Sequence, residues 1–447
     1  MSKTCLMMVA GERSGDVYGA RLARALTERL REIEIFGCGG EAMRHAGVET
    51  TVDARQFAMV GITEVVSGLP RAYRALHRLL DEAHRRRPQL AILIDSPSLN
   101  MRVAKQLKRQ KIAVAYFISP QIWAWKGWRL GQLKTRVDKM LCIFDFEQRI
   151  YQGVGIPVEY VGHPLADTVH ASLTREAFFA RVGLDLTTPT VALLPGSREI
   201  ELSLILPTML EAAAQLARVR PIQFVIALAP TVDPRWVESR FLRPLWKRME
   251  SDSIGGRMQR AWDNFCKAVM AAWSNVLQVV AAPPGLRVPI NQPLRPRAVQ
   301  ASNARRARIC TIYGATYDAL RHADVAVVAS GTATVEAALL ERPMVVVYRV
   351  APLTGFLARF MVSVPFYSMV NLLAGKGVAP ELIQSDFTAE KVAAQVSNLL
   401  DDPCACEAMT AELRALKSRL GPGGAIERAA DAVVRMLEPS AVGVDVA

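Results

Sequence analysis

The stretch TVALLPGSREIEL, residues 190–202, sets an apolar run, a tight turn and a helix-like segment in immediate succession. An apolar run that ends at Pro195–Gly196 is typical of a buried parallel strand followed by a helix. The backbone N–H groups at such a helix start face an anion, and Arg198 adds a bidentate donor. Taken alone, however, the tripeptide at 196–198 favours an ordinary strand-to-helix turn with a surface arginine.

A second stretch, ASGTATVE at residues 329–336, repeats the strand, turn and helix. The small residues Ser330, Gly331 and Thr332 let a phosphate approach the backbone. Glu336, about one helical turn further on, can accept hydrogen bonds from ribose hydroxyls; the alternative is a solvated helix glutamate. Two such turns at the carboxyl ends of adjacent strands together favour a nucleotide-sugar site.

Both turns belong to a repeated alternation of apolar runs and helical stretches. The runs lie at residues 4–11, 32–40, 88–98, 112–120 and 139–144, and again at 189–194, 222–230, 324–329 and 343–350. Strands that alternate with helices form parallel sheets. The sequence therefore predicts the α/β class, with two Rossmann-like, doubly wound parallel-sheet domains that face a cleft.

The length of 447 residues fits two domains. The predicted segments are an N-terminal domain at 1–168, a second domain at 185–390 with a basic, proline-rich insertion at 241–310, C-terminal helices at 391–438, and a flexible tail at 439–447. The C-terminal helices either cross back to the first domain or swap between subunits.

The net charge is +13 and the sequence pI is near 9.6. Such a charge indicates an anionic partner: nucleic acid, an acidic lipid or a phosphorylated metabolite. Residues 241–310 hold twelve Lys or Arg and three Asp or Glu, so the rest of the chain carries only +4. The charge is concentrated in the insertion, which is either disordered or binds lipid phosphates.

Several classes of protein are disfavoured by what the sequence lacks. Its seven cysteines include no CxxC pair, which disfavours zinc and a disulfide framework and favours a reduced, cytosolic compartment. Neither Asp-x-Asp nor His-Glu-x-x-His occurs, so we expect no metal ion. Glu12 interrupts the pattern of a signal peptide. The most promising uncharged run, residues 360–375, is too short to span a membrane.

Two carboxylates of the first domain follow predicted strands. Asp95, in ILIDSPSLN at 92–100, stands where a partly desolvated carboxylate with a raised pKa could take a proton from a sugar hydroxyl. Its alternative role is to order the turn that follows it. For Glu12 we favour a role in catalysis or acceptor binding, and for Asp16 a capping role. His163 is more often structural at such a position than a direct participant.

The motifs in chain order are GERSGD (11–16), MVGITEV (59–65), IDSP (94–97), SPQIWAW (119–125), GHPLAD (162–167), LLPGSREIE (193–201), ASGTATVE (329–336) and NLLAG (371–375). This ordered set strongly resembles the lipid-A-disaccharide synthase family of Gram-negative bacteria. The resemblance runs from about residue 5 to 435, apart from the insertion. Its most specific part is the combination of SPQIWAW with GERSGD.

The resemblance implies a GT-B, inverting, metal-independent glycosyltransferase that uses no cofactor. The donor would be UDP-2,3-diacylglucosamine and the acceptor 2,3-diacylglucosamine 1-phosphate (lipid X). The products would be the lipid A disaccharide 1-phosphate and UDP. The family also implies a cytoplasmic enzyme that is peripherally associated with the cytoplasmic face of the inner membrane. It implies no nucleic-acid partner and leaves a homodimer open.

The same resemblance assigns residues to roles. Asp95 is the general base, and Glu12 is an essential neighbour. The UDP-binding positions are Gly196, Ser197, Arg198, Ser330, Gly331, Thr332, Glu336 and Asn371. An apolar surface element of the family maps to Val65, Val66, Leu69 and Tyr73, which would face the membrane unless they belong to a plain amphipathic core helix. The acceptor positions are inferred from their place instead: Ser119, Gln121 and Trp123 follow a predicted strand at the cleft edge, one strand beyond Asp95, and would line the acceptor pocket. Our hypothesis is that Lys126 and Arg129 then meet the acceptor's 1-phosphate.

Two residues depart from the family pattern, and two rival functions stay open. Val370 stands where the family commonly has proline, and Ser98 where relatives often carry aspartate. One rival is a GT-B enzyme acting on UDP-N-acetylglucosamine, such as a cell-wall transferase or a 2-epimerase. The other is a nucleic-acid- or lipid-binding protein driven by the positive charge of residues 241–310.

Overall fold

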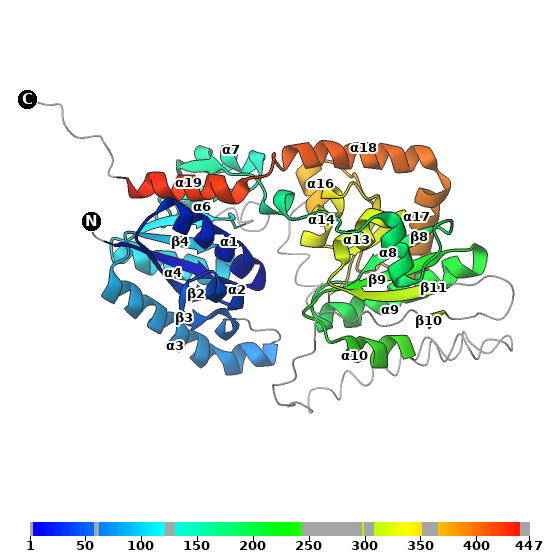
Figure 1. Cartoon of the computed structure of the whole chain (residues 1–447), viewed down its shortest axis with the longest axis horizontal. Helices are drawn as coiled ribbons and strands as arrows, with labels where there is room; N and C mark the ends of the chain where they lie inside the picture. Colours follow the sequence, from blue (N-terminus) through cyan, green and yellow to red (C-terminus); the bar gives the residue numbers. More distant parts are fainter. Residues whose placement is uncertain are drawn as a thin grey trace, which may run out of the picture. The chain divides into compact units, whose positions relative to one another are not determined.

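The computed structural model describes residues 3–57, 62–120, 130–243, 297–298, 308–350 and 365–438, the side chains of 62–69 and 297–298 excepted. The chain forms two compact units. Of the described residues, the first unit comprises those up to 168 and those at 417–438, and the second comprises those between 169 and 350 and those at 365–416 (Figure 1).

The first unit is built on a seven-stranded parallel sheet with the order β3-β2-β1-β4-β5-β6-β7. Its strands are β1 (Thr4–Ala10), β2 (Ile33–Gly39), β3 (Glu49–Asp53), β4 (Leu90–Ile94), β5 (Ala113–Phe117), β6 (Lys139–Cys142) and β7 (Val158–Tyr160). The sheet is close-packed at its centre. Gly37 shows this, because a Cβ there would lie 2.1 Å from the carbonyl oxygen of Met8 on the adjacent strand.

Helices cover both faces of this sheet. They are α1 (Arg13–Arg29), α2 (Glu41–His45), α3 (Ile62–Arg86), α4 (Pro97–Arg109), α6 (Leu130–Lys134), α7 (Asp145–Gly153) and α19 (Ala425–Leu437). Apolar side chains of α3 and α4 pack against alternate residues of β1, β2 and β4 to form one core. The C-terminal α19 packs on α1, where Arg29 forms ion pairs of 2.7 Å with both Glu427 and Asp431.

The second unit has a seven-stranded sheet with the order β10-β11-β9-β8-β12-β13-β14, parallel except for β10. Its strands are β8 (Thr190–Leu194), β9 (Gln223–Leu228), β10 (Arg297–Ala298), β11 (Arg308–Tyr313), β12 (Val325–Ala329), β13 (Met344–Tyr348) and β14 (Glu381–Ile383). The predicted α/β class and the two doubly wound parallel sheets are confirmed.

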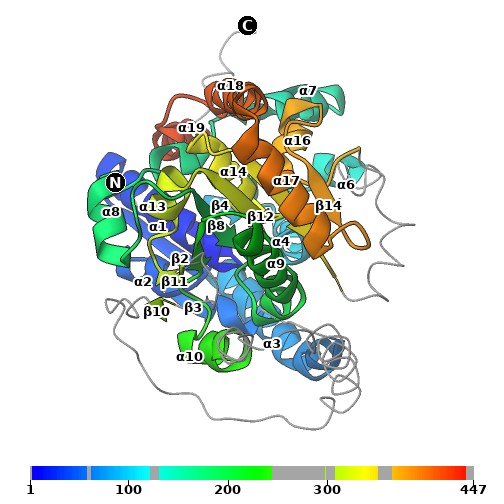
Figure 2. The ribbon, with the colours of Figure 1, turned by 90° about the vertical axis from the view of Figure 1, so that its right-hand side faces the viewer.

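The helices of the second unit follow its strands. They are α8 (Arg175–Val182), α9 (Glu199–Val219), α10 (Pro234–Val237), α13 (Thr316–His322), α14 (Thr332–Leu339), α16 (Met369–Ala374), α17 (Ala389–Asp401) and α18 (Pro403–Arg419), whose end reaches the first unit. By length and composition α9 could cross a membrane, but it packs beside α17 (Figure 2). Its buried side chains, among them Leu202, Ile205 and Met209, make it part of the core of this unit.

The sequence did not predict five strands that carry few apolar residues or lie in the basic stretch: β3, β7, β10, β11 and β14. The most consequential is β11, which begins at Arg308 and pairs with β9 along its whole length. Residues 308–310 therefore belong to the sheet and not to the predicted insertion at 241–310. The rest of that insertion from 244 on, apart from 297–298, lies outside the described residues.

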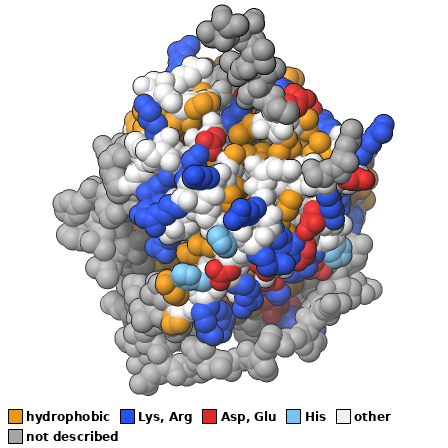
Figure 3. Space-filling model, turned by 90° about the vertical axis from the view of Figure 1, so that its left-hand side faces the viewer, with side chains coloured by type: hydrophobic (Ala, Val, Ile, Leu, Met, Phe, Trp, Pro, Cys, Tyr) orange, Lys and Arg blue, Asp and Glu red, His pale blue; other side chains and the backbone are white. Residues whose placement is uncertain are grey.

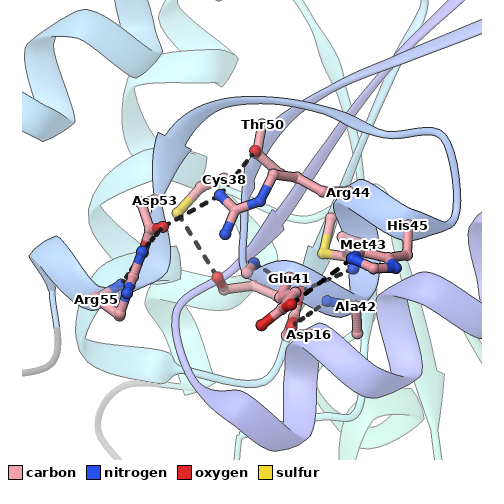
Figure 4. A network of polar contacts seen from close by, with 12 residues as sticks. Asp16, Cys38, Glu41, Ala42, Met43, Arg44, His45, Thr50, Asp53 and Arg55 are labelled. Carbon is pink, nitrogen blue, oxygen red and sulfur yellow. Dashed lines mark hydrogen bonds and ion pairs between the residues drawn. The ribbon is translucent and has the colours of Figure 1, made fainter. Parts of the chain in front are cut away.

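Asp16 has the capping role that the sequence favours, although it caps α2 and not its own helix. From the first turn of α1, its buried carboxylate accepts hydrogen bonds from the backbone N–H groups of Gly40 (2.6 Å), Ala42 (3.1 Å) and Met43 (3.1 Å) (Figure 4). These are donors that the helix itself leaves unpaired. One side chain thus joins the helix after β1 to the helix after β2.

We predict that Asp16→Ala lowers the free energy of unfolding by about 1–3 kcal/mol, because three buried N–H groups lose their acceptor. Thermal and urea unfolding measure this loss. The matched control is Asp81→Ala, which removes an exposed carboxylate on α3 and should change stability by no more than about 0.5 kcal/mol. Equal effects of the two substitutions would contradict the capping role.

Candidate active site

Each sheet reverses its strand order between two adjacent central strands. In the first unit these strands are β1 and β4, and in the second they are β8 and β12. In open α/β sheets, ligands bind at the carboxyl ends of the strands at such a point. The sequence-predicted residues Glu12 and Asp95 follow β1 and β4, and the turns at 196–198 and 330–332 follow β8 and β12. The prediction that the two turns end adjacent strands is therefore confirmed.

The two carboxylates of the first unit influence each other. Asp95 is half-buried and Glu12 is exposed. Burial, and secondly the negative charge of Glu12, raise the pKa of Asp95 to about 6. A carboxylate with such a pKa is ionised at neutral pH and is a better proton acceptor than an ordinary aspartate. This arrangement suits a general base.

The backbone at Asp95 is strained. Asp95 and Ser96 have φ angles of 48° and 44°, so two successive residues other than glycine occupy the left-handed region. This conformation costs roughly 1–2 kcal/mol per residue. Gly11 allows the turn after β1 to pack against it, since a Cβ on Gly11 would lie 3.0 Å from Ser96 Oγ. Such strain persists only where the surroundings hold it, and it concentrates at functional sites.

The first turn of the second unit offers backbone donors, and a carboxylate already occupies them. Glu201, on the first turn of α9, accepts hydrogen bonds from the backbone N–H groups of Ser197 (2.9 Å) and Arg198 (3.3 Å). Its other oxygen lies 3.7 Å from Arg198 Nη1. Gly196 has a φ of 118°, and a Cβ there would clash with Glu201. The turn is thus shaped to hold an anionic group.

The second turn combines small residues with a half-buried glutamate. Gly331, with a φ of 151°, and Thr332 are exposed. Ser330 Oγ donates to the carbonyl oxygen of Tyr367 (2.9 Å). Glu336 accepts a hydrogen bond from the Tyr317 hydroxyl (3.4 Å), and burial raises its pKa. The turn leaves open space beside the backbone at Gly331.

The side chain of Asn371 is hydrogen-bonded to residues of its own unit. Its side chain is 1% exposed. Its amide nitrogen donates to Glu381 (2.8 Å) and to the carbonyl oxygen of Ala379 (2.8 Å), while its oxygen accepts from the N–H groups of Val378 and Ala379. Glu381 in turn accepts from the N–H groups of Tyr367 and Ser368. Asn371 therefore braces the segment that bears Tyr367, the partner of Ser330.

Ser119 is the one predicted acceptor-pocket residue whose side chain is described. It is buried, and its hydroxyl donates to the buried carboxylate of Glu147 (2.5 Å). Gln121, Trp123, Lys126 and Arg129 lie outside the described residues. Of the predicted acyl-facing residues, Tyr73 is 63% exposed on α3, and the side chains of Val65, Val66 and Leu69 are outside the described set.

His163 is structural. The ring is buried, Nδ1 accepts a hydrogen bond from the N–H of Leu165 (3.1 Å), and burial lowers the pKa of the imidazole to about 3. It begins the short helix at Pro164–Asp167. No group of three or more His, Cys, Asp or Glu in the described part of the chain could hold a metal ion.

Sequence reasoning missed the residues that support the site, namely Asn100, Tyr116, Glu201 and Glu381. Glu201 could have been predicted, because it is the third residue of α9, and a glutamate at that position commonly completes a capping box. Asn100 lies six residues after the strand end at Ile94 and carried no comparable pattern. Tyr116 and Glu381 reach their partners only through the fold.

Comparison with known proteins matches the chain to a family model and to curated relatives. The chain matches the family model described as Lipid-A-disaccharide synthetase over residues 6–238 and 282–421. The unmatched stretch is thus shorter than the predicted insertion. The Lipid-A-disaccharide synthase of Myxococcus xanthus (strain DK1622) is 38% identical over 438 residues, which are 98% of this chain and 98% of the relative.

Solved structures with the same fold include a putative UDP-N-acetylglucosamine 2-epimerase from Listeria monocytogenes, with a TM-score of 0.56, 13% identity and coverage of 98% of this chain and 97% of that one. The glycotransferase of kitacinnamycin has a TM-score of 0.55, 15% identity and coverage of 97% and 98%. Identities this low establish the fold alone. That fold is GT-B, as the sequence predicts.

We predict that His163 makes the protein sensitive to acid. Because its pKa is about 3 in the folded state and about 6.5 when unfolded, the unfolded chain binds the proton more tightly. Stability is fully present above pH 6.5 and is lost as the pH falls towards 3, by up to about 1.4 kcal/mol per pH unit. In His163→Asn, which keeps a capping acceptor, this part of the loss should vanish.

Thermal unfolding between pH 7 and 4 measures the difference between the variant and the natural chain. The matched control is His170→Asn, at an exposed histidine, which should leave the pH dependence unchanged. The same slope in the natural chain and in His163→Asn would contradict the buried, neutral state of His163.

Proposed function

The chain belongs to the lipid-A-disaccharide synthetase family, and we propose that it transfers 2,3-diacylglucosamine from UDP-2,3-diacylglucosamine to the 6-hydroxyl of 2,3-diacylglucosamine 1-phosphate. The products are lipid A disaccharide 1-phosphate and UDP. Family membership makes the chain a glycosyltransferase of lipid A biosynthesis. The observation that carries the proposed chemistry is Asp95, a strained, half-buried carboxylate with a raised pKa at the strand-order reversal of the first unit.

In the proposed reaction Asp95 accepts the proton of the acceptor's 6-hydroxyl. The oxygen attacks C1 of the donor sugar from the face opposite UDP, and the bond from C1 to the diphosphate oxygen breaks in the same step. The configuration at C1 is inverted. The Asp95 pKa of about 6 allows the carboxylate to be ionised before the reaction and still take the proton as charge develops.

The leaving diphosphate carries the charge that the enzyme has to stabilise. The proposed ligands are the N–H groups of Ser197 and Arg198 and the guanidinium of Arg198, which is 58% exposed and free to reorient. Gly331 and Thr332 line the second turn, and Glu336 accepts from the ribose hydroxyls. The diphosphate takes the N–H groups now bonded to Glu201, so the Glu201 side chain has to swing away.

The acceptor would lie on the first unit, within reach of Asp95 and of the segment that begins at Ser119. The acylated substrates place the enzyme at the cytoplasmic face of the inner membrane, bound peripherally. Lys and Arg side chains are spread widely over the face of the first unit shown in Figure 3, with hydrophobic side chains between them. Cations beside apolar groups suit an anionic lipid surface.

The direct test is transfer of the diacylglucosaminyl group between the two lipid precursors in detergent, with EDTA present. We expect the disaccharide 1-phosphate and UDP as products, and a preference for the acylated donor over UDP-N-acetylglucosamine. In Asp95→Asn, turnover should fall by about two to four orders of magnitude, because the amide cannot accept the proton. UDP should bind as before, as measured by calorimetry.

The pH profile separates a base from a structural residue. In the natural chain the rate should rise with pH through about 6, since only ionised Asp95 accepts the proton. Glu12→Gln should move this midpoint lower, because the Glu12 charge is the second cause of the raised pKa. Unchanged turnover in Asp95→Asn would rule Asp95 out as the base, and preference for the non-acylated donor would overturn the proposed substrates.

The phosphate site can be tested with substitutions of opposite effect. Arg198→Ala should weaken UDP binding by about tenfold or more, because a charged hydrogen bond is lost. Glu201→Gln should tighten it by a few-fold, since a neutral amide repels phosphate less and competes less for the N–H groups.

Calorimetric titration with UDP and with inorganic diphosphate measures both effects. Arg218→Ala, an exposed arginine in the last turn of α9, is the matched control and should bind both normally. Unchanged UDP affinity in Arg198→Ala would move the phosphate site elsewhere.

A further inference from the structure

The turn that bears Asp95 is held by two buried side chains that sequence reasoning did not single out. Asn100, from α4, donates its amide hydrogens to the carbonyl oxygens of Ile94 (3.0 Å) and Asp95 (2.8 Å). Tyr116, from β5, donates its hydroxyl to the same Asp95 carbonyl oxygen (2.6 Å). Both side chains are 0% exposed. Donors from two different elements therefore converge on one backbone oxygen.

The other side of this residue is fixed as well. The N–H of Asp95 donates to the carbonyl oxygen of Phe117 on β5 (3.0 Å). With both its N–H and its carbonyl bonded, Asp95 cannot leave the left-handed conformation without breaking buried hydrogen bonds. Breaking them would leave polar groups unpaired in the core, which costs more than the backbone strain.

Two buried polar atoms near the turn support a functional reason for this arrangement. Ser96 Oγ and Asn100 Oδ1 have no hydrogen-bond partner among the residues that the structure describes. Unpaired buried acceptors destabilise a protein, so a region arranged for stability alone would avoid them. Here they accompany two left-handed residues at the end of a central strand. Unsatisfied buried polar groups and backbone strain are both features that concentrate at functional sites.

We propose that Tyr116 and Asn100 are positioning residues, which clamp the carbonyl of Asp95 and thereby hold its carboxylate where it takes the proton from the acceptor. This inference rests on the proposed function. Neither side chain is exposed, so neither touches a substrate, and their effect passes through the backbone of Asp95. A base displaced by about 1 Å can lose about 100-fold in rate while the substrates still bind.

The test is Tyr116→Phe, which removes one oxygen atom. We expect kcat to fall about tenfold or more, while KM for both substrates and Kd for UDP stay within about twofold. The acidic midpoint of the rate profile should also move from about 6 towards the ordinary value for aspartate, because a released carboxylate is better solvated. A residue that merely contributes to stability would move neither kcat nor this midpoint.

The matched control is Tyr160→Phe. Tyr160 also donates its hydroxyl to a backbone carbonyl oxygen, that of Arg419 (2.9 Å), in the same unit, but it lies on β7, three strands away from β4. We expect a change in Tm no larger than that of Tyr116→Phe, because Tyr160 is only half-buried, and no change in kcat. A Tyr116→Phe variant whose kcat matches that of Tyr160→Phe, or whose KM rises instead, would overturn the clamp.

A second variant relieves the strain that the clamp opposes. Ser96→Gly places a residue that adopts positive φ freely at the second position of the turn. Added to Tyr116→Phe, it should restore part of the lost turnover; no recovery would contradict the proposal. If Tyr116→Phe alone does not fold, the double variant is compared with Ser96→Gly, and equal kcat values would overturn the clamp.

The controls also separate this inference from the function on which it rests. If the natural chain and Tyr160→Phe form the disaccharide but Tyr116→Phe does so equally well, the clamp alone is wrong. If the natural chain forms no disaccharide from the two lipid precursors, the proposed function is wrong.

Discussion

The reversal of strand order at the centre of each sheet is the constraint on which the site depends. At β1/β4 and at β8/β12 the helices that follow adjacent strands leave towards opposite faces, so the carboxyl ends of these strands stay uncovered. The first reversal carries carboxylates and the second carries backbone donors with an arginine. The same reversal of strand order therefore positions the proposed proton acceptor in the first unit and the proposed phosphate site in the second.

The sequence predicted those strands that are continuous apolar runs. β1, β4, β8 and β12 are buried along most or all of their length, and burial on both faces requires such runs. β3 and β7 have mixed burial patterns and left no such run. β11 was hidden for another reason: Arg308 begins it, and the basic residues before it made the segment look like part of a loop.

The sequence predicted the site residues that stand at strand ends. It did not predict the residues that support them through hydrogen bonds from other elements. Glu12, Asp95 and the two glycine turns stand at strand ends, so position along the chain locates them. Asn371 is hydrogen-bonded to Glu381, which is 10 positions away in the sequence. Asp95 is hydrogen-bonded to Tyr116, which is 21 positions away. No spacing rule predicts such pairs, because they form only when neighbouring elements of the sheet are in register.

The docking of α19 on α1 has a consequence for the order in which the chain folds during synthesis. The first unit takes its last helix from residues 425–437, so its packing stays incomplete until almost the whole chain has been made. The second unit needs no residue beyond Leu416, so its last helices are made before α19. An N-terminal domain usually folds first as it emerges. Here the second unit, although it comes later in the chain, can complete its packing before the first unit does.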